Sequence, residues 1–361
     1  MLSGGIERSR PLLAARWHAR LDIRIDDVPM PSPAANQALL KVLWCGICGT
    51  DLEEFREGPL TVPVGTPHPT SGRLAPLTLG HEVVARIEVA ARDGSGPSVG
   101  TVVLPDVVVG CGHCWWCRRH EDGLCPNLSV LGQTDDGGLA QYMVATAAHC
   151  LKVPSGMDPG EAALSEPAAV AIRALRKLPQ LLGARIAVIG GGTIGQLVAQ
   201  SARSSGAALV VMVDPLVDRR VLAHRLSGAR VCTPTELPAL AAGLGEPGFD
   251  AVIECTGRPG VLRQSVSLVR RGGVVVAVGL RPGDESLDLA DLVLGEKTVI
   301  GSAAHLWDTD VADAVTMMSD GRLTVAPLIS HRLPLPDLVS LGLAVLSDPT
   351  SGALKVLIDC R

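Results

Sequence analysis

The sequence predicts an α/β protein in which a β-rich part of the chain is followed by a doubly wound parallel sheet. Up to about residue 150, short Val, Leu and Ile runs alternate with Gly and Pro, as in sheets with tight turns. From Ala184, apolar runs without period-2 alternation are separated by stretches of helical periodicity. Strands buried on both faces have such runs, so helices are expected on either side of this sheet.

In the β-rich part, the clearest strand patterns cover Ala38–Trp44, Glu82–Ala90 and Thr101–Val109. The stretch Gly58–Pro76 is rich in proline and has no period, which indicates a long ordered loop. We expect residues 1–12 to form a mobile extension ahead of the first strand.

The parallel sheet is expected to use four strongly apolar runs and two weaker ones. These are Arg185–Ile189, Leu209–Val213, Ala251–Cys255 and Val274–Val278, with Arg230–Cys232 and Lys297–Ile300 as further strands. After about residue 303 the pattern becomes mixed again. The last part of the chain predicts a helix over Leu333–Leu346 and a strand over Ala353–Asp359.

Length and charge restrict the function. With 361 residues, the chain can form two domains with a sizeable core. A net charge of −5 argues against a nucleic-acid partner, which usually needs a basic face. No apolar run approaches the roughly 18 residues that span a bilayer, and the N-terminal stretch lacks the apolar centre of a signal peptide. A cytoplasmic protein without a membrane partner is therefore expected.

Four cysteines, at positions 111, 114, 117 and 125, have the spacing C-x2-C-x2-C-x7-C. Short C-x2-C steps let thiolates converge on one ion, and four thiolates complete a tetrahedral zinc site. A disulfide framework would require an oxidising compartment, which nothing else in the chain suggests. Because four protein ligands leave no open position, Cys111, Cys114, Cys117 and Cys125 predict a structural zinc.

A glycine motif follows the first predicted strand of the parallel sheet. Residues 190–195 read G-G-G-T-I-G and open a predicted helix. The glycines allow a tight turn and close approach of a pyrophosphate, which the free N–H groups of the helix terminus then bind. The motif predicts a dinucleotide site that includes Gly190, Gly192, Thr193, Ile194 and Gly195.

The acidic residue that such a site needs is Asp214, 19 residues after Gly195 at the end of the second strand. A carboxylate here binds a ribose diol and repels a 2′-phosphate, so NAD is favoured over NADP. Arg219 and Arg220 lie close by and keep NADP as the alternative. We also expect Val278 and Leu280, at and just beyond the end of a later strand, to contact the cofactor.

Further upstream stand CGICGTD at residues 45–51 and GHE at residues 80–82. Together with the four-cysteine lobe and the glycine motif, they follow the order found in zinc-dependent medium-chain dehydrogenases. The chain resembles this family over nearly everything after residue 12, and most of all the branch of butanediol, sorbitol and threonine dehydrogenases.

The resemblance implies a GroES-like β-barrel catalytic domain and a Rossmann, doubly wound NAD-binding domain. The catalytic domain is expected over residues 1–165 and 306–361, with the cofactor domain inserted over residues 166–305. Relatives assemble as dimers or tetramers, which implies a homodimer or homotetramer here.

The resemblance also implies a second, catalytic zinc with three protein ligands and one open position. Cys48 and His81 match two ligands of the family. The third is a carboxylate, for which Glu166 in LSEPAAVAI is favoured and Glu82 is the alternative. Asp51 is expected to hydrogen-bond the His81 imidazole.

The implied reaction is reversible oxidation of a secondary alcohol to a ketone, with hydride transfer to a nicotinamide. Thr50 would accept the alcohol proton, and Glu53, where many relatives have His, would relay it to solvent. A vicinal diol, polyol or cyclitol is the expected substrate. The alternatives are a dehydrogenase of a specialised sugar or aminocyclitol pathway, an epimerase with tightly bound NAD, and a non-catalytic zinc-binding protein.

Overall fold

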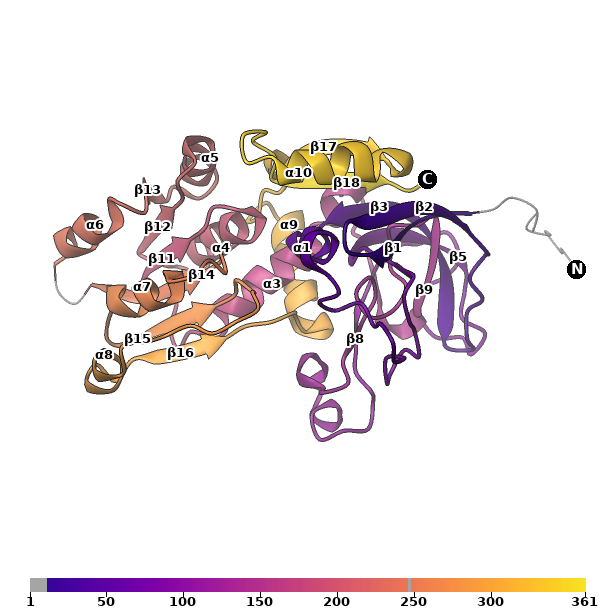
Figure 1. Cartoon of the computed structure of the whole chain (residues 1–361), viewed down its shortest axis with the longest axis horizontal. Helices are drawn as coiled ribbons and strands as arrows, with labels where there is room; N and C mark the ends of the chain where they lie inside the picture. The colour runs from indigo at the N-terminus through magenta and orange to yellow at the C-terminus, as the bar shows by residue number, and fades with distance from the viewer. Residues whose placement is uncertain (1–11, 246–247) are drawn as a thin grey trace, which may run out of the picture. The chain divides into compact units, whose positions relative to one another are not determined.

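The computed structural model describes residues 12–245 and 248–361, and the chain forms two compact units (Figure 1). One unit comprises the chain up to Glu166 and again from Ala326, and the other comprises Pro167–Val325. The expected N-terminal extension lies outside the described residues, except for Leu12, which is the first residue of a strand. No described helix is long and apolar enough to cross a membrane.

The first unit is built on sheets that are antiparallel except for the parallel pair β17 and β18. A three-stranded sheet has the order β2-β1-β4, and a larger sheet has the order β10-β6-β5-β3-β18-β17, with β9 also paired to β3. The strands are β1 (Leu12–Ala19), β2 (Asp22–Val28), β3 (Gln37–Ile47), β4 (Leu77–Thr78), β5 (Glu82–Val89), β6 (Val102–Pro105), β9 (Tyr142–Thr146), β10 (Cys150–Lys152), β17 (Ile329–Pro334) and β18 (Lys355–Asp359).

Helices and a small lobe complete this unit. The lobe lies between β7 (Val108–Val109) and β8 (Ser129–Val130), and Figure 1 shows it as a projection from its unit. The helical segments are α1 (Gly49–Glu57), η1 (Cys117–Arg119), η2 (Asp122–Leu124), η3 (Ala147–His149), α2 (Pro159–Ala162), η5 (Ala326–Leu328), η6 (Leu335–Asp337), η7 (Leu338–Leu343) and α10 (Ala344–Ser347). Helix α3 (Ser165–Leu175) begins in this unit and continues into the other.

The central strand β3 determines which residues meet at one end of the sheet. Gly46 lies opposite Glu82 on β5 and opposite Leu357 on β18. A Cβ at Gly46 would lie 2.0 Å from Oε2 of Glu82, so only glycine leaves room for that carboxylate. The register therefore places the end of β3, the start of β5 and the start of β18 side by side.

The proline-rich stretch after α1 is an ordered loop, as predicted. Its first residues are held by Glu54, which is buried and whose carboxylate accepts the N–H groups of Leu60 (2.9 Å) and Thr61 (2.7 Å). The Trp17 indole N–H donates to the backbone carbonyl of Glu54 at 2.9 Å. These bonds replace the regular secondary structure that the prolines prevent.

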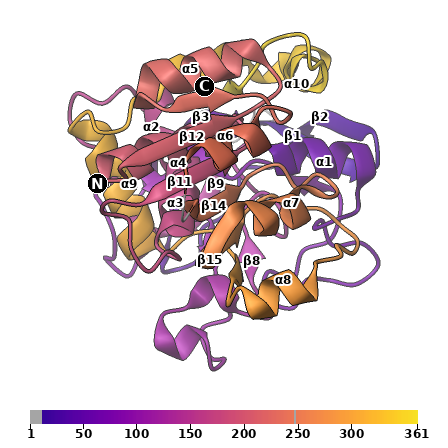
Figure 2. The same cartoon turned by 90° about the vertical axis from the view of Figure 1, so that its left-hand side faces the viewer.

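The second unit contains the predicted doubly wound sheet, whose strands are all parallel in the order β13-β12-β11-β14-β15-β16. In Figure 2 its strands lie one beside the next. They are β11 (Arg185–Ile189), β12 (Leu209–Val213), β13 (Arg230–Cys232), β14 (Phe249–Glu254), β15 (Val269–Ala277) and β16 (Thr298–Gly301). The helices are α4 (Thr193–Ser204), α5 (Val217–Ser227), α6 (Leu237–Gly243), α7 (Val261–Leu268), α8 (Leu289–Leu294), η4 (Trp307–Val311) and α9 (Ala312–Ser319).

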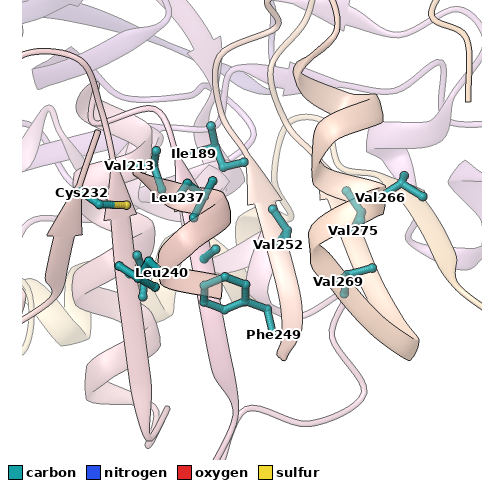
Figure 3. Packing of buried hydrophobic residues seen from close by; sticks show 12 residues of the cluster. Ile189, Val213, Cys232, Leu237, Leu240, Phe249, Val252, Val266, Val269 and Val275 are labelled. Carbon is teal, nitrogen blue, oxygen red and sulfur yellow. The ribbon is translucent and has the colours of Figure 1, made fainter. Parts of the chain in front are cut away.

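The core of this unit explains the continuous apolar runs. Phe249, Ala187 and Val252 are fully buried in one cluster between the sheet and its helices, together with Leu237 and Val266 (Figure 3). Strands that are covered on both faces have such apolar runs, for example LVVMV in β12.

The structure corrects the expected boundary at residue 306, because the chain stays in the second unit until Val325. Asp310, which is fully buried, pairs with Arg173 of α3 and with Arg176 directly after α3, and it accepts the N–H of Leu306 at 2.7 Å. Thr324 exchanges two hydrogen bonds with the Gln200 amide of α4. These polar contacts connect residues 306–325 to α3 and α4. They cannot be predicted from the hydrophobic periodicity of the sequence.

Two predicted elements also differ in extent. The expected helix over Leu333–Leu346 begins only at Leu335, because Leu333 and Pro334 pair with β18 as the end of β17. The expected strand over Thr101–Val109 is divided into β6 and β7, and the Asp106 carboxylate between them accepts the N–H of Val108 at 3.0 Å.

Replacing Asp310 should destabilise the second unit. Asp310→Asn removes a buried charge from its pair with Arg176, and we expect the free energy of unfolding to fall by about 2 kcal/mol. Asp313→Asn is the matched control, since the Asp313 side chain is 55% exposed and pairs with the same arginine. Chemical denaturation measures the free energy of unfolding of both variants. Equal stability of the two variants would contradict the role assigned to Asp310.

Candidate metal and cofactor sites

The four lobe cysteines converge in the structure. Their Sγ atoms all lie within 4.8 Å of one another, and none forms a disulfide. The N–H groups of Cys111 and Cys117 each donate to another cysteine of the set, with N···S distances of 3.4 Å. A Cβ at Gly110 would lie 2.6 Å from the Sγ of Cys117, so the lobe needs glycine there. Four converging thiols with N–H donors fit one tetrahedral zinc ion.

A second group contains Cys48, His81 and Glu82, whose ligand atoms also lie within 4.8 Å of one another. Cys48 precedes α1, and its N–H donates to the Asp51 carboxylate at 2.9 Å. Thr50 lies in the first turn of the same helix, and its Oγ1 lies 3.4 Å from Nε2 of His81. The turn into α1 therefore brings the predicted proton acceptor beside a predicted metal ligand.

The expected hydrogen bond between Asp51 and His81 is not formed. Nδ1 of His81 lies 3.8 Å from Oδ1 of Asp51, which is an ion-pair distance too long for a hydrogen bond. Both atoms are buried without a hydrogen-bond partner among the described residues.

Lys355 is a member of this site that sequence reasoning missed. It is buried, and its Nζ lies 2.5 Å from Oε1 of Glu82 and 2.9 Å from the carbonyl oxygen of Ile47. The other carboxylate oxygen of Glu82, Oε2, is buried without a partner among the described residues. One signal was present in the sequence, because Lys355 is a single charged residue inside the apolar run ALKVLI.

The charges around this group favour a cation. Burial raises the pKa of Glu166 to about 7, against the lowering effect of His81, and Glu82 raises it further. Burial also raises the pKa of Asp51. Several acidic groups thus face one lysine, and a divalent ion would offset the excess negative charge. The donor set fits zinc. Glu166 is not part of the group formed by Cys48, His81 and Glu82 within 4.8 Å.

Glu53, the predicted relay residue, is exposed on α1. Partial burial raises its pKa, and the neighbouring Glu57 carboxylate adds to the effect. No hydrogen bond joins Glu53 to Thr50 within the described part of the chain, so a proton passing between them would need water.

The glycine turn has the shape that a dinucleotide needs. It follows β11, where the strand order reverses between β11 and β14. Gly190 has a φ of +104°, which favours glycine. A Cβ at Gly195 would lie 1.7 Å from the Gly190 carbonyl oxygen, whereas a Cβ at Gly192 would meet nothing within 4 Å. The turn is therefore tight toward the sheet and open at the start of α4, where Thr193 and Ile194 follow.

Asp214 lies at the end of β12 beside this turn, as predicted. Its two carboxylate oxygens accept the N–H groups of Gly191 (2.7 Å) and Leu216 (2.8 Å). Nη1 of Arg219 lies 3.8 Å from Oδ2 of Asp214. The Arg220 guanidinium instead donates to the backbone carbonyl of Asp214 at 2.7 Å. The Asp214 carboxylate is thus held in place by two hydrogen bonds. Of the two arginines, Arg219 is the one whose guanidinium lies beside this carboxylate.

The neighbouring loop contains a residue that the sequence did not single out. Glu254, buried at the end of β14, accepts the N–H groups of Thr256 (2.6 Å) and Gly257 (3.1 Å). Its carbonyl oxygen accepts the N–H of Val278 at 2.8 Å. Leu280 is 70% exposed. Glu254 therefore orders the loops around Val278 and Leu280, both predicted to contact the cofactor.

Comparison with known proteins shows the family to which the chain belongs. Residues 34–155 match the family described as "Alcohol dehydrogenase GroES-like domain", and residues 193–320 match "Zinc-binding dehydrogenase". The chain is 31% identical to (R,R)-butanediol dehydrogenase of Bacillus subtilis (strain 168), over 96% of this chain and 99% of that protein.

Solved structures give the same result. The crystal structure of 2R,3R-butanediol dehydrogenase from Bacillus subtilis has a TM-score of 0.89 at 30% identity, covering 97% of this chain and 100% of that one. A protein from Sinorhizobium meliloti 1021, bound to NADP, has a TM-score of 0.87 at 29% identity, with coverage of 97% and 100%. With its GroES-like unit and its Rossmann unit, the chain belongs to the zinc-dependent medium-chain dehydrogenases, NAD(P)-dependent enzymes that act on alcohol groups.

Proposed function

We propose that the protein oxidises a secondary alcohol, namely a vicinal diol, polyol or cyclitol, reversibly to the ketone with NAD as hydride acceptor. The observation that carries the proposal is the group of the partly buried Cys48 and the buried His81 and Glu82, with the Thr50 hydroxyl beside it. The similarity to a butanediol dehydrogenase over almost the whole chain supports a diol-like substrate. We expect it to act in the cytoplasm as a homodimer or homotetramer.

We propose that Cys48 and His81 hold the catalytic zinc together with one carboxylate. Glu166 is favoured over Glu82 because Lys355 already engages one oxygen of Glu82. When bound, the ion supplies Lewis-acid chemistry that makes the alcohol proton easier to lose.

The protein's own groups then handle that proton. The Thr50 hydroxyl accepts it and passes its own proton on, since Thr50 lies in the first turn of α1, two residues after the ligand Cys48, and reaches His81. Glu53, one turn further along α1, takes it to solvent through water. The raised pKa of Glu53 brings this carboxylate nearer to the pH at which it would exchange protons.

We propose that the glycine turn binds the pyrophosphate and that Asp214 binds the adenosine ribose. Two backbone N–H groups orient the Asp214 carboxylate, whose remaining lone pairs can accept ribose hydroxyls. Its charge disfavours a 2′-phosphate, while Arg219 weakens that discrimination. Val278 and Leu280 would contact the nicotinamide end.

The first experiment is a turnover assay with vicinal diols, polyols and simple secondary alcohols, with NAD and NADP in parallel. We expect stoichiometric NADH release from a diol or polyol, loss of activity after chelation, and weaker activity with NADP. Turnover of the alcohol without NADH release would support an epimerase instead. Activity confined to primary alcohols would refute the substrate assignment.

Zinc content should report the two metal sites separately. Cys117→Ala and Cys48→Ala should each lose about one zinc ion per chain. Cys117→Ala should also lower the unfolding temperature, because a closed site stabilises the fold, whereas Cys48→Ala should chiefly lose activity. Cys150→Ala, at a buried cysteine outside both groups, is the control. Elemental analysis measures the zinc content of each variant, and thermal unfolding measures its stability. An unchanged zinc content in Cys117→Ala or Cys48→Ala would reject the corresponding zinc site.

The pH profile tests the proton path. Glu53 accepts protons only when ionised, so wild-type alcohol oxidation should slow as the pH falls through its raised pKa. Glu53→Gln should lower kcat about ten-fold and flatten this limb without loss of zinc. Glu57→Gln, on the same helix, is the matched control: it should keep the plateau kcat and shift this limb only to lower pH, because it removes a charge that raises the pKa of Glu53. Thr50→Val should lower kcat at every pH. Identical pH profiles for wild type and Glu53→Gln would remove Glu53 from the path.

A further inference from the structure

Gln196 is a fully buried polar residue on α4, immediately after the glycine motif. Burying an amide is unfavourable unless it is hydrogen-bonded. Its Nε2 donates to two backbone carbonyls, that of Gly191 at 3.2 Å and that of Arg219 at 2.8 Å. These carbonyls belong to the glycine turn and to the first turn of α5. The amide therefore connects two segments that approach each other beside Asp214.

The orientation of this amide is determined by its partners. If the amide were turned over, Oε1 would face two carbonyl oxygens and both bonds would be lost. In the observed orientation, Oε1 is buried without a partner among the described residues. The two donated bonds are thus the contacts that justify a glutamine here.

The connected segments carry the charges of the nucleotide site. The Gly191 N–H donates to Asp214, and a Cβ on Gly191 would lie 3.2 Å from the Cβ of Arg219. No side chain caps the start of α5. Gln196 is therefore a side-chain tie that keeps Arg219, at the first turn of α5, against the glycine turn.

The position of Arg219 determines how strongly Asp214 acts on a nucleotide. Nη1 of Arg219 is 3.8 Å from the Asp214 carboxylate, and its side chain is 31% exposed. At such a separation, a small shift changes the interaction of two charges substantially. Arg220 cannot replace it without losing its bonds to the carbonyls of Asp214 and Pro215.

We propose that Gln196 is a positioning residue that sets the preference between NAD and NADP by fixing Arg219 beside Asp214. The inference rests on the proposed nucleotide site. It concerns the ratio of the two affinities, so it can be tested whichever nucleotide binds more tightly. Without the tie, the first turn of α5 moves away, and Arg219 offers less attraction to a 2′-phosphate.

The test measures dissociation constants of NADH and NADPH by fluorescence titration. Gln196→Met keeps the length of the side chain and removes its donors. We expect the ratio of the NADPH constant to the NADH constant to rise about three-fold or more. Gln200→Met is the matched control, because Gln200 lies one turn along α4, is 2% exposed, and exchanges two hydrogen bonds with Thr324. It should alter stability and leave the ratio unchanged.

A double-mutant cycle with Arg219→Ala isolates the mechanism. Arg219→Ala alone should raise the ratio, and adding Gln196→Met should then change it no further, because Gln196 acts through Arg219. The proposal would be overturned if Gln196→Met weakened the binding of NADH and NADPH equally. It would also be overturned if Gln196→Met changed the ratio of the two dissociation constants as much in the Arg219→Ala variant as in the wild type. A wild type that prefers NADPH would contradict the proposed NAD dependence and leave this test intact. Binding of neither nucleotide would refute both proposals.

Discussion

The ion pair between Glu82 and Lys355 is the interaction on which the first unit depends most. Both side chains are buried, and a buried charge without its partner is strongly destabilising. The two residues lie 273 positions apart, so the pair connects the start of β5 with a strand from the end of the chain. Because Lys355 also binds the carbonyl oxygen of Ile47 on β3, one ammonium group joins three strands. The C-terminal segment therefore contributes to the candidate metal site. This contribution depends on the return of the chain to the first unit from Ala326 onward.

The second unit organises its site mainly by hydrogen bonds between side chains and backbone groups. The reversal of strand order opens the end of β11, and the glycine turn there presents backbone N–H groups. Buried polar side chains such as Gln196 and Glu254 bind backbone groups of the surrounding loops. The two sites thus differ in electrostatics. One concentrates buried acids and suits a cation, whereas the other offers N–H groups to phosphates and one oriented carboxylate to a ribose.

Features defined by short sequence spacing could be predicted. The four lobe cysteines, the glycine turn and Asp214 lie where the sequence placed them, because their geometry depends on neighbouring residues. Features that depend on polar contacts between residues far apart in the sequence could not be predicted. The expected boundary at residue 306 was wrong, since Asp310 pairs with Arg176 across 134 positions. Lys355 was missed for the same reason. The expected bond between Asp51 and His81 required a distance that no spacing determines.

The ion pair also bears on the third zinc ligand, which the sequence left between two carboxylates. Lys355 is held by the Ile47 carbonyl and cannot follow Glu82 without losing that bond. Glu82 could therefore offer only Oε2, and the adjacent ammonium group would weaken the attraction of this carboxylate for a second cation. Burial raises the pKa of Glu166, so its ionised form gains from a nearby divalent ion. On these electrostatic grounds we favour Glu166 as the proposed permanent ligand, and Glu82 would then serve mainly to neutralise the lysine that joins the three strands.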